Sequence, residues 1–132
     1  MANRGTARSG AMAEEVAAGR LIEAGWRVLG RNVRVGRHEL DIVAVDPTPP
    51  ARLVAVEVRY RTRRDYGVAE ESFDRGKQAR TLAALMTLRS AGRLDDGTIV
   101  PALTPAVDLI VIEPAVTSRG AIRVRHHRDV LV

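Results

Sequence analysis

The chain has 132 residues, a net charge of +5 at pH 7 and 45% hydrophobic residues. Its length predicts one globular domain, and the lack of cysteine excludes disulfides and thiolate metal sites. The positive charge has two interpretations that are about equally good: binding of an anionic partner such as nucleic acid, or an ordinary basic surface exposed to solvent. No stretch resembles a signal peptide or a membrane span, which predicts a cytoplasmic protein with no membrane partner.

The first residues of the chain are small, polar and basic. We expect residues 1–8 to form a disordered tail, followed by a single domain over residues 9–132. A helix is predicted to begin at a cap on Ser9 and to end near Ala24, because apolar residues recur there at helical spacing.

Three strands are predicted next, because valine-rich runs alternate with turn residues. They cover residues 26–35, 38–45 and 52–60. Only a short proline-rich turn joins the second and third strands, so these two strands are predicted to form an antiparallel hairpin.

The second half of the chain is predicted to hold one helix and two strands. Residues 61–72 are predicted to be a loop, and a helix is predicted from near Asp74 to about Ser90. Its core face is predicted to consist of Ala79, Leu82, Ala83 and Met86. After an unassigned connection, a buried strand and an edge strand are predicted over residues 106–113 and 121–127.

Acidic residues interrupt both strands of the predicted hairpin. Strand side chains alternate between faces, so Asp41 and Glu57 oppose each other when the turn is centred near Pro49. Directly opposed Cβ atoms lie about 4.5–5.5 Å apart. Two carboxylates at that distance repel unless they share a proton, face a cation or bind a metal. A set of oxygen ligands suits Mg²⁺ or Mn²⁺.

A structural interpretation of these acids stays open. Glu39 would lie opposite Arg59 as an ordinary cross-strand ion pair, and Asp41 and Glu57 would line a solvated face neutralised by nearby arginines. The residues predicted on the opposite face of the second strand are Leu40, Ile42 and Ala44.

Glu14 lies at the margin of the apolar stripe of the first predicted helix. It is a candidate third oxygen ligand beside Asp41 and Glu57. The alternative is that it lies in the first helical turn and only complements the helix dipole. The pattern alone leaves both interpretations open.

Asp41, a turn and then Glu57-Val58-Arg59 resemble the D…(D/E)-x-K signature of the restriction-endonuclease-like superfamily. Further segments resemble the YraN-type family of uncharacterised bacterial proteins: AEEVAAGRLIEAGWRVLGRNVR, HELDIVAV, LVAVEVRYR, FDRGKQARTLAAL and AVDLIVI. They cover most of residues 10–112. The resemblance implies an α/β restriction-endonuclease-like fold, with a central mixed sheet of about five strands flanked by helices, similar to Holliday junction resolvases.

The resemblance also implies roles for individual residues. Asp41 and Glu57 would be the ligands of Mg²⁺ or Mn²⁺, with Glu14 at the helical acid position. Glu39 would support the site, and Arg59 would hold the basic position beside the phosphate.

Other residues are candidate contacts to nucleic acid. Lys77 and Gln78 match the family's Lys-Gln pair at the second helix and would contact phosphate or the rim of the site. The arginines after the third strand are predicted to track the nucleic-acid backbone, with a solvated basic loop as the alternative: Arg61, Arg63 and Arg64. His126 and His127 are predicted to be surface residues of the last strand.

The chain departs from the family pattern at three positions. Arg59 stands where the superfamily usually has Lys, and His38 and Ala13 stand where the family usually has Gly. An arginine keeps the charge but cannot act as a base. Lys77 is the single lysine among 21 basic residues. Arg59 therefore has two explanations: a general drift from Lys to Arg in this sequence, or a loss of catalysis.

The function predicted from these features is metal-dependent hydrolysis of phosphodiester bonds in nucleic acid, with DNA, including branched DNA, as the expected partner. One alternative is a nucleic-acid-binding protein that keeps the nuclease fold without cleavage. A further alternative is a protein-interaction module. A homodimer would suit branched substrates, as in related resolvases.

Overall fold

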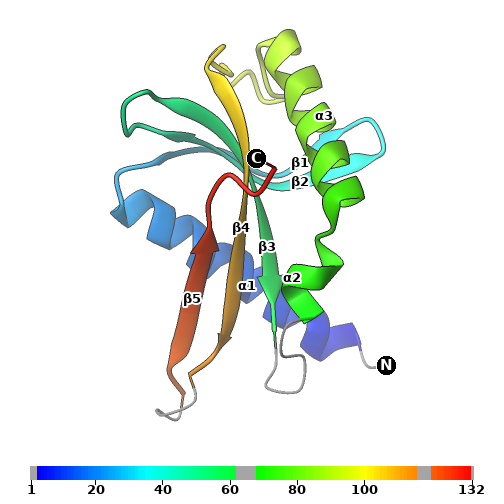
Figure 1. Cartoon of the computed structure of the whole chain (residues 1–132), viewed down its shortest axis with the longest axis vertical. Coiled ribbons are helices and arrows are strands. Elements are labelled where there is room, and N and C mark those ends of the chain that lie inside the picture. The colour runs from blue at the N-terminus through cyan, green and yellow to red at the C-terminus, as the bar shows by residue number, and fades with distance from the viewer. Residues whose placement is uncertain (1–2, 62–67, 116–119, 132) are drawn as a thin grey trace.

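The computed structural model describes residues 3–61, 68–115 and 120–131. Within them, strands form one mixed sheet in the order β1-β2-β3-β4-β5, and only β3 and β4 run parallel (Figure 1). The strands are β1 (Arg27–Val35), β2 (His38–Asp46), β3 (Arg52–Tyr60), β4 (Thr104–Pro114) and β5 (Ile122–His127). The helices are α1 (Asn3–Glu23), α2 (Val68–Ser72) and α3 (Arg75–Ala91).

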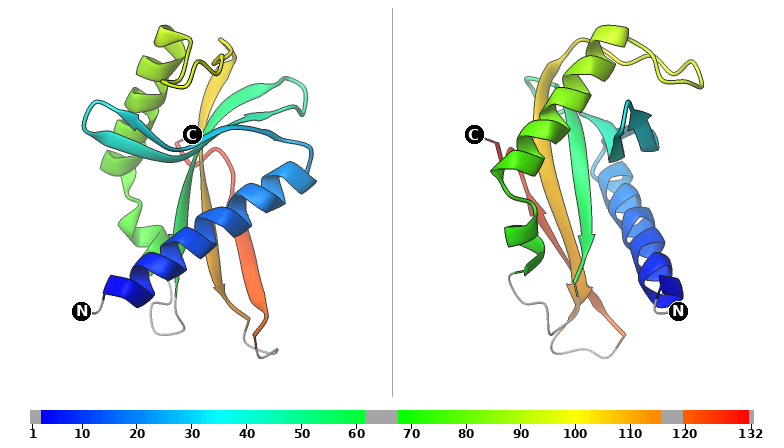
Figure 2. Two further views of the ribbon diagram at one scale, coloured as in Figure 1. Left: turned by 180° about the vertical axis from the view of Figure 1, so that it is seen from behind. Right: turned by 90° about the vertical axis from the view of Figure 1, so that its right-hand side faces the viewer.

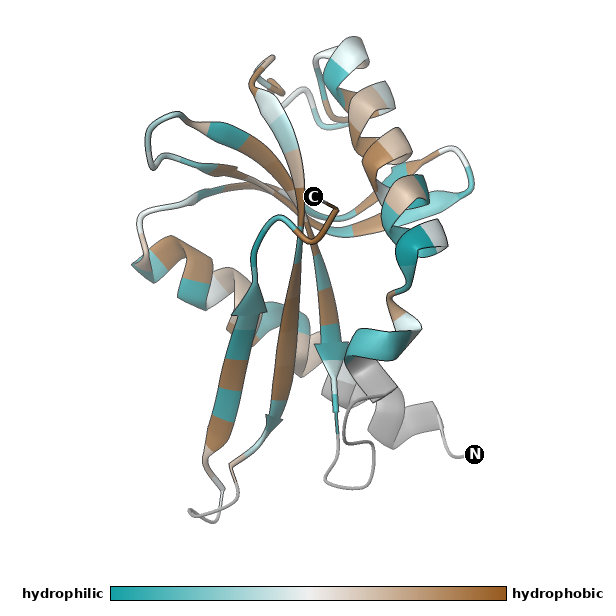
Figure 3. Cartoon of the chain, in the orientation of Figure 1, coloured by the Kyte–Doolittle hydropathy of each residue, from teal (hydrophilic) through white to brown (hydrophobic). Residues whose placement is uncertain are grey.

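Helices cover both faces of the sheet (Figure 2). On one face, α1 packs against apolar residues of β2, β3 and β4 such as Ile42, Val54 and Ile110. On the other face, α3 packs against Val43 and Leu53. Figure 3 shows that β4 is apolar over most of its length, whereas polar and apolar residues alternate along the edge strand β5. This is the restriction-endonuclease-like α/β architecture that the resemblance implied.

The β2–β3 hairpin has the register predicted from its turn. Ile42 pairs with Val56 at the end of the β2–β3 ladder, whereas β2 continues to pair with β1 as far as His38. The two strands therefore separate at the next positions, Asp41 and Glu57. The separation opens a fork in the sheet at the two predicted acids.

Leu40 is an exception to the predicted alternation along β2. Ile42 and Ala44 pack on the α1 side, but Leu40 packs with Val43 in the cluster under α3. Before Ile42, β2 is paired with β1 alone, and ribbons of two strands twist more strongly than larger sheets. This twist turns Leu40 toward α3, so the prediction that it shares a face with Ile42 is wrong.

The first helix is longer than predicted. It begins at Asn3, so residues 3–8, predicted to be a disordered tail, are helical, and Ser9 lies inside the helix. No proline interrupts this segment, and its arginines and alanine favour a helix. Among the described residues, no helix is both long enough and apolar enough to cross a membrane.

The start of α3 is confirmed, but most of its predicted core face is wrong, since Leu82 alone of its four residues packs against the core. Asp74 caps the helix, because its side chain accepts a hydrogen bond of 3.0 Å from the Lys77 N–H. Ala79, Ala83 and Met86 are exposed, and the buried residues are Thr81, Ala84, Leu85 and Leu88. Alanines lie on several sides of this helix, so small apolar residues do not mark one face. The short α2 lies in a region predicted to be a loop.

Candidate active site

The candidate active site lies at the fork between β2 and β3. The Asp41 carboxylate accepts a hydrogen bond from the Val58 N–H, with 2.9 Å between Oδ2 and N. This bond ties Asp41 to β3 beyond the last backbone pair of the hairpin. It holds the carboxylate beside Glu57, on the neighbouring strand, as the predicted register requires.

The two carboxylates are partly buried and incompletely neutralised. Burial and the charge of Glu57 raise the pKa of Asp41 from 3.8 to about 7, although the Val58 hydrogen bond opposes this rise. Burial also raises the pKa of Glu57, even though the charges of Arg59 and Lys77 act to lower it. The pair therefore holds a proton close to neutral pH, as two neighbouring acids do when no cation fully compensates them.

Arg59 faces the acid pair from β3. Its Nε lies 3.5 Å from Glu57 Oε1 and has no hydrogen-bond partner among the described residues, although it is buried. Its guanidinium carbon lies 6.0 Å from the centre of the Phe73 ring, within the range of a cation–π contact. Arg59 thus pairs with Glu57 on its own strand, and not with Glu39 across the hairpin.

Glu14 approaches the same site from α1. Burial and the charge of Asp41 raise the pKa of Glu14, and Glu39 adds to this effect. Glu14 lies in the interior of α1, so the interpretation that it complements the helix dipole in the first turn is wrong. The structure brings Glu14 near the pair from a third element of the fold.

Asn32 of β1 is a site residue that the sequence analysis missed. With its amide nitrogen turned toward α1, Asn32 donates to both carboxylate oxygens of Glu14 at 3.2 Å. Its φ of 50° lies in the left-handed region, which costs a residue other than glycine about 1–3 kcal/mol. The local sequence carries no signal for this contact, because the contact depends on a backbone conformation and on a partner in another element.

The donor set of the acid pair fits a hard divalent cation. Asp41 and Glu57 present carboxylate oxygens from two strands. Burial is the main cause of their raised pKa values, and for Asp41 the charge of Glu57 adds to it, while the charge of Arg59 only partly offsets the rise. Among the described residues, no three or more His, Asp or Glu side chains converge closely enough to bind a metal. Glu14 is therefore a neighbour of the pair in this arrangement. Two carboxylates with water at the other positions are a common set for Mg²⁺.

Lys77 and Gln78 lie at the start of α3. The charge of Lys77 lowers the pKa of Glu57, which places its ammonium group within electrostatic reach of the acid pair. Gln78 donates from Nε2 to the backbone carbonyl of Phe73 at 2.7 Å. Its amide therefore supports the connection between α2 and α3.

Arg61 occupies a different position from the one predicted. Its side chain is only 5% exposed and forms ion pairs with Glu113 of β4 and with Glu70 of α2. Such a buried guanidinium holds α2 against the sheet and is not open to a phosphate, so this part of the predicted nucleic-acid contact is wrong. Arg63 and Arg64 lie outside the described residues.

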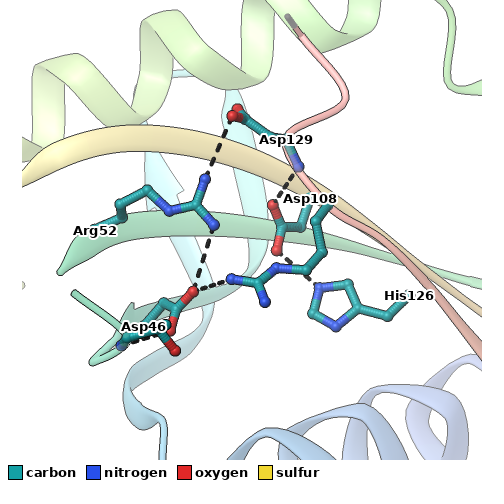
Figure 4. Close-up of polar contacts among 7 residues, drawn as sticks. Asp46, Arg52, Asp108, His126 and Asp129 are labelled. Carbon is teal, nitrogen blue, oxygen red and sulfur yellow. Dashed lines mark hydrogen bonds and ion pairs between the residues drawn. The ribbon is translucent and has the colours of Figure 1, made fainter. Parts of the chain in front are cut away.

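A second group of acids, also missed from sequence, is paired with groups that the fold itself supplies. Asp108 of β4 is fully buried; its Oδ2 is 2.8 Å from His126 Nε2, and its Oδ1 accepts from the Asp129 N–H at 2.8 Å (Figure 4). His127 lies 3.3 Å from Glu70. His126 is exposed and His127 is half-buried, in keeping with the predicted surface position, but both have acidic partners that the sequence analysis missed.

Asp46, at the end of β2, belongs to this second group (Figure 4). Its carboxylate binds Arg52 at 3.4 Å and also binds Arg128, whose guanidinium carbon lies 5.5 Å from the centre of the Trp26 ring. Burial alone would raise the pKa of Asp46, but hydrogen bonds from Thr48 and the charge of Arg128 outweigh it and lower the pKa. The ion pairs of Asp46 therefore stabilise the fold.

Known proteins resemble this chain over most of the described fold. The family model described as "Uncharacterised protein family UPF0102" matches residues 13–112, which include Glu14, Asp41 and Glu57. A UPF0102 protein of Dechloromonas aromatica is 41% identical over 83 residues, 63% of this chain and 67% of the relative. One of Pelotomaculum thermopropionicum is 42% identical over 85 residues, 64% and 68% of the two chains. One of Pseudomonas entomophila is 43% identical over 89 residues, 67% and 70% of the two chains.

Proposed function

The chain belongs to the uncharacterised protein family UPF0102, and we propose that it is a metal-dependent nuclease that hydrolyses phosphodiester bonds of nucleic acid. The observation that carries the proposal is the pair Asp41 and Glu57. Two partly buried carboxylates with raised pKa values meet where the sheet forks, and Arg59 forms an ion pair with one of them, Glu57. Neighbouring acids whose pKa values are raised by burial and by a like charge are typical of a functional site.

In this proposal Asp41 and Glu57 hold a Mg²⁺ or Mn²⁺ ion. The Val58 N–H fixes the orientation of the Asp41 carboxylate. Glu14, held by Asn32, adds negative charge on the α1 side of the ion. Bound by Asp41 and Glu57, such an ion would supply a water of lowered pKa and would neutralise charge on the scissile phosphate.

The protein's own groups position the substrate. Arg59 is aimed at the acid pair and donates from its guanidinium to a phosphate oxygen as negative charge develops. Lys77 adds positive charge at the rim on the α3 side. Because Arg59 cannot accept a proton, the proton of the attacking water is taken by a carboxylate of the site or by solvent. The expected substrate is DNA, including branched DNA.

The second candidate function is nucleic-acid binding without cleavage. Arg59 favours it, because this arginine stands at the usual lysine position and is already engaged with Glu57 and Phe73. A guanidinium held in this way contributes positive charge, but it is a planar, rigid group that reorients toward a phosphate less freely than a lysine ammonium group does.

The two functions are separated by measuring Mn²⁺ binding and cleavage on the same samples. Calorimetric titration with Mn²⁺ and a gel assay with labelled linear and branched DNA are applied to the wild type and to Asp41→Asn. Glu23→Gln, which removes the same charge at an exposed site, is the control. A nuclease loses both metal binding and cleavage in Asp41→Asn alone. Metal-independent DNA binding without cleavage supports the second function, and equal cleavage by all samples identifies a contaminant.

A further inference from the structure

A groove of about 590 Å³ lies between the β1–β2 turn and α3. The turn projects beside the helix in Figure 1 and in the left-hand view of Figure 2. Arg37 and His38 line the groove from the turn, and Arg80 lines it from the helix. His38 Nε2 lies 3.4 Å from Thr81 Oγ1, so the two walls touch at one end.

This end of the groove adjoins the candidate active site. His38 begins β2, the strand that carries Asp41. On the opposite wall, Arg80 follows Lys77 by one helical turn, and the charge of Lys77 acts on Glu57. The groove therefore lies between the two elements that carry Asp41 and Lys77.

The cations of the groove differ from the arginines that are paired inside the fold. Arg61 and Arg125 are occupied by buried carboxylates. Arg37 and Arg80 are exposed and have no ion-pair partner among the described residues. No acidic side chain lines the groove. Its positive charge is thus available to an anionic ligand.

The groove also has an apolar wall. Val35, Ala83 and Ala84 line it between the cations. A duplex presents its charged phosphates outward and shields its bases, so it offers little to such a wall. An unpaired strand presents both phosphates and base faces, and proteins bind its backbone through a cationic groove. The small apolar residues of this wall leave room for the bases to lie against it.

We infer that this groove binds an unpaired nucleic-acid strand, with Arg37 and Arg80 on its phosphates and the apolar wall against its bases, and delivers the strand to the acid pair. The inference rests on the proposed nuclease function. It adds a substrate class to that function, namely nucleic acid with a single-stranded segment. It also moves the strand-binding role from the buried Arg61 to two arginines that the sequence did not single out.

The test is fluorescence anisotropy with a labelled oligo-dT strand and a duplex of equal length, in EDTA, over a range of salt. The double variant Arg37→Ala/Arg80→Ala is compared with Arg20→Ala/Arg27→Ala, which removes two exposed arginines elsewhere. We expect the groove variant to bind oligo-dT at least about tenfold more weakly, with a salt slope smaller by about 1.4. The control should bind like the wild type. Ala83→Glu, which places a negative charge on the apolar wall, should weaken binding as well.

Three outcomes overturn the inference. They are an equal loss in both double variants, unchanged binding in the groove variants, and tighter binding of the duplex than of oligo-dT by the wild type. Mn²⁺ calorimetry on the same proteins separates this inference from the proposed function. If the groove variants bind both oligo-dT and Mn²⁺ like the wild type, the proposal that the groove binds the strand is wrong, while the proposed metal site is unaffected. If the wild type binds neither Mn²⁺ nor nucleic acid, both proposals fail.

Discussion

Asp41 and Asp108 are two buried or partly buried aspartates of one sheet with opposite surroundings. One carboxylate oxygen of Asp108 contacts His126, and the other accepts a hydrogen bond from the Asp129 N–H (Figure 4). Asp41 receives a single backbone N–H and faces a second carboxylate, Glu57. The first aspartate is satisfied by groups that the fold itself supplies, whereas the second lacks a positive partner of its own.

The difference distinguishes an acid that stabilises the fold from an acid kept for a ligand. A buried carboxylate costs stability unless hydrogen bonds and cations compensate it. Around Asp46 and Asp108, side chains of the protein itself supply that compensation. Around Asp41 and Glu57 it is incomplete, and a divalent cation would complete it. The two regions should therefore respond in opposite ways when their acids are changed.

The largest expected effect is on metal affinity. Glu57→Gln removes one of the two proposed ligands and should weaken Mn²⁺ binding at least about 100-fold, since even residues that only support ligands account for about 10–100-fold. Asp108→Asn, an equal change in the satisfied region, should leave the calorimetric affinity unchanged. Similar losses in both variants would show that the two regions do not differ in function.

The next largest effect is on stability. Asp108→Ala removes the partners of His126 and of the Asp129 N–H, and we expect it to lower the free energy of unfolding by about 2–3 kcal/mol. The single tryptophan, Trp26, lies 5.6 Å from the His126 ring, so its fluorescence should report the change in chemical denaturation. Asp41→Ala, measured in EDTA at pH 8, should cost much less. An equal cost for both would contradict the proposed division between the regions.

The sequence predicted the acid pair because the pair depends on local rules. Strand alternation and a short proline-rich turn determine which residues of β2 and β3 oppose each other. Which charges neutralise one another depends instead on packing between distant elements. Arg61 and its partner Glu113 are 52 residues apart, and no local pattern distinguishes this buried arginine from an exposed one. The face of α3 was mispredicted for a related reason, because alanines surround the helix and only the packed sheet selects one side.

A third effect concerns pH. The pKa of Asp41 is 3.8 in its usual state and about 7 in the folded protein, so the folded chain binds more protons than the unfolded chain between these values. Its contribution to stability is present below about pH 4 and is lost as pH rises through 7. Asp41→Asn stays neutral and can still accept from the Val58 N–H. In EDTA it should melt several degrees above the wild type at pH 8 and at the same temperature near pH 4. A melting difference that does not change with pH would mean that the aspartate is not protonated in the fold.

The smallest expected effect tests how Glu14 is held. Asn32→Gly removes the amide that donates to Glu14 but keeps a backbone of φ 50°, which glycine adopts without strain. We expect Mn²⁺ affinity to fall about tenfold, because the Glu14 carboxylate loses its orientation beside the acid pair. Asp129→Gly is the matched control, since Asp129 also has positive φ, at 54°, but belongs to the satisfied region. If both glycine variants bind Mn²⁺ like the wild type, Glu14 acts only through its charge, and the contact from Asn32 does not serve the site.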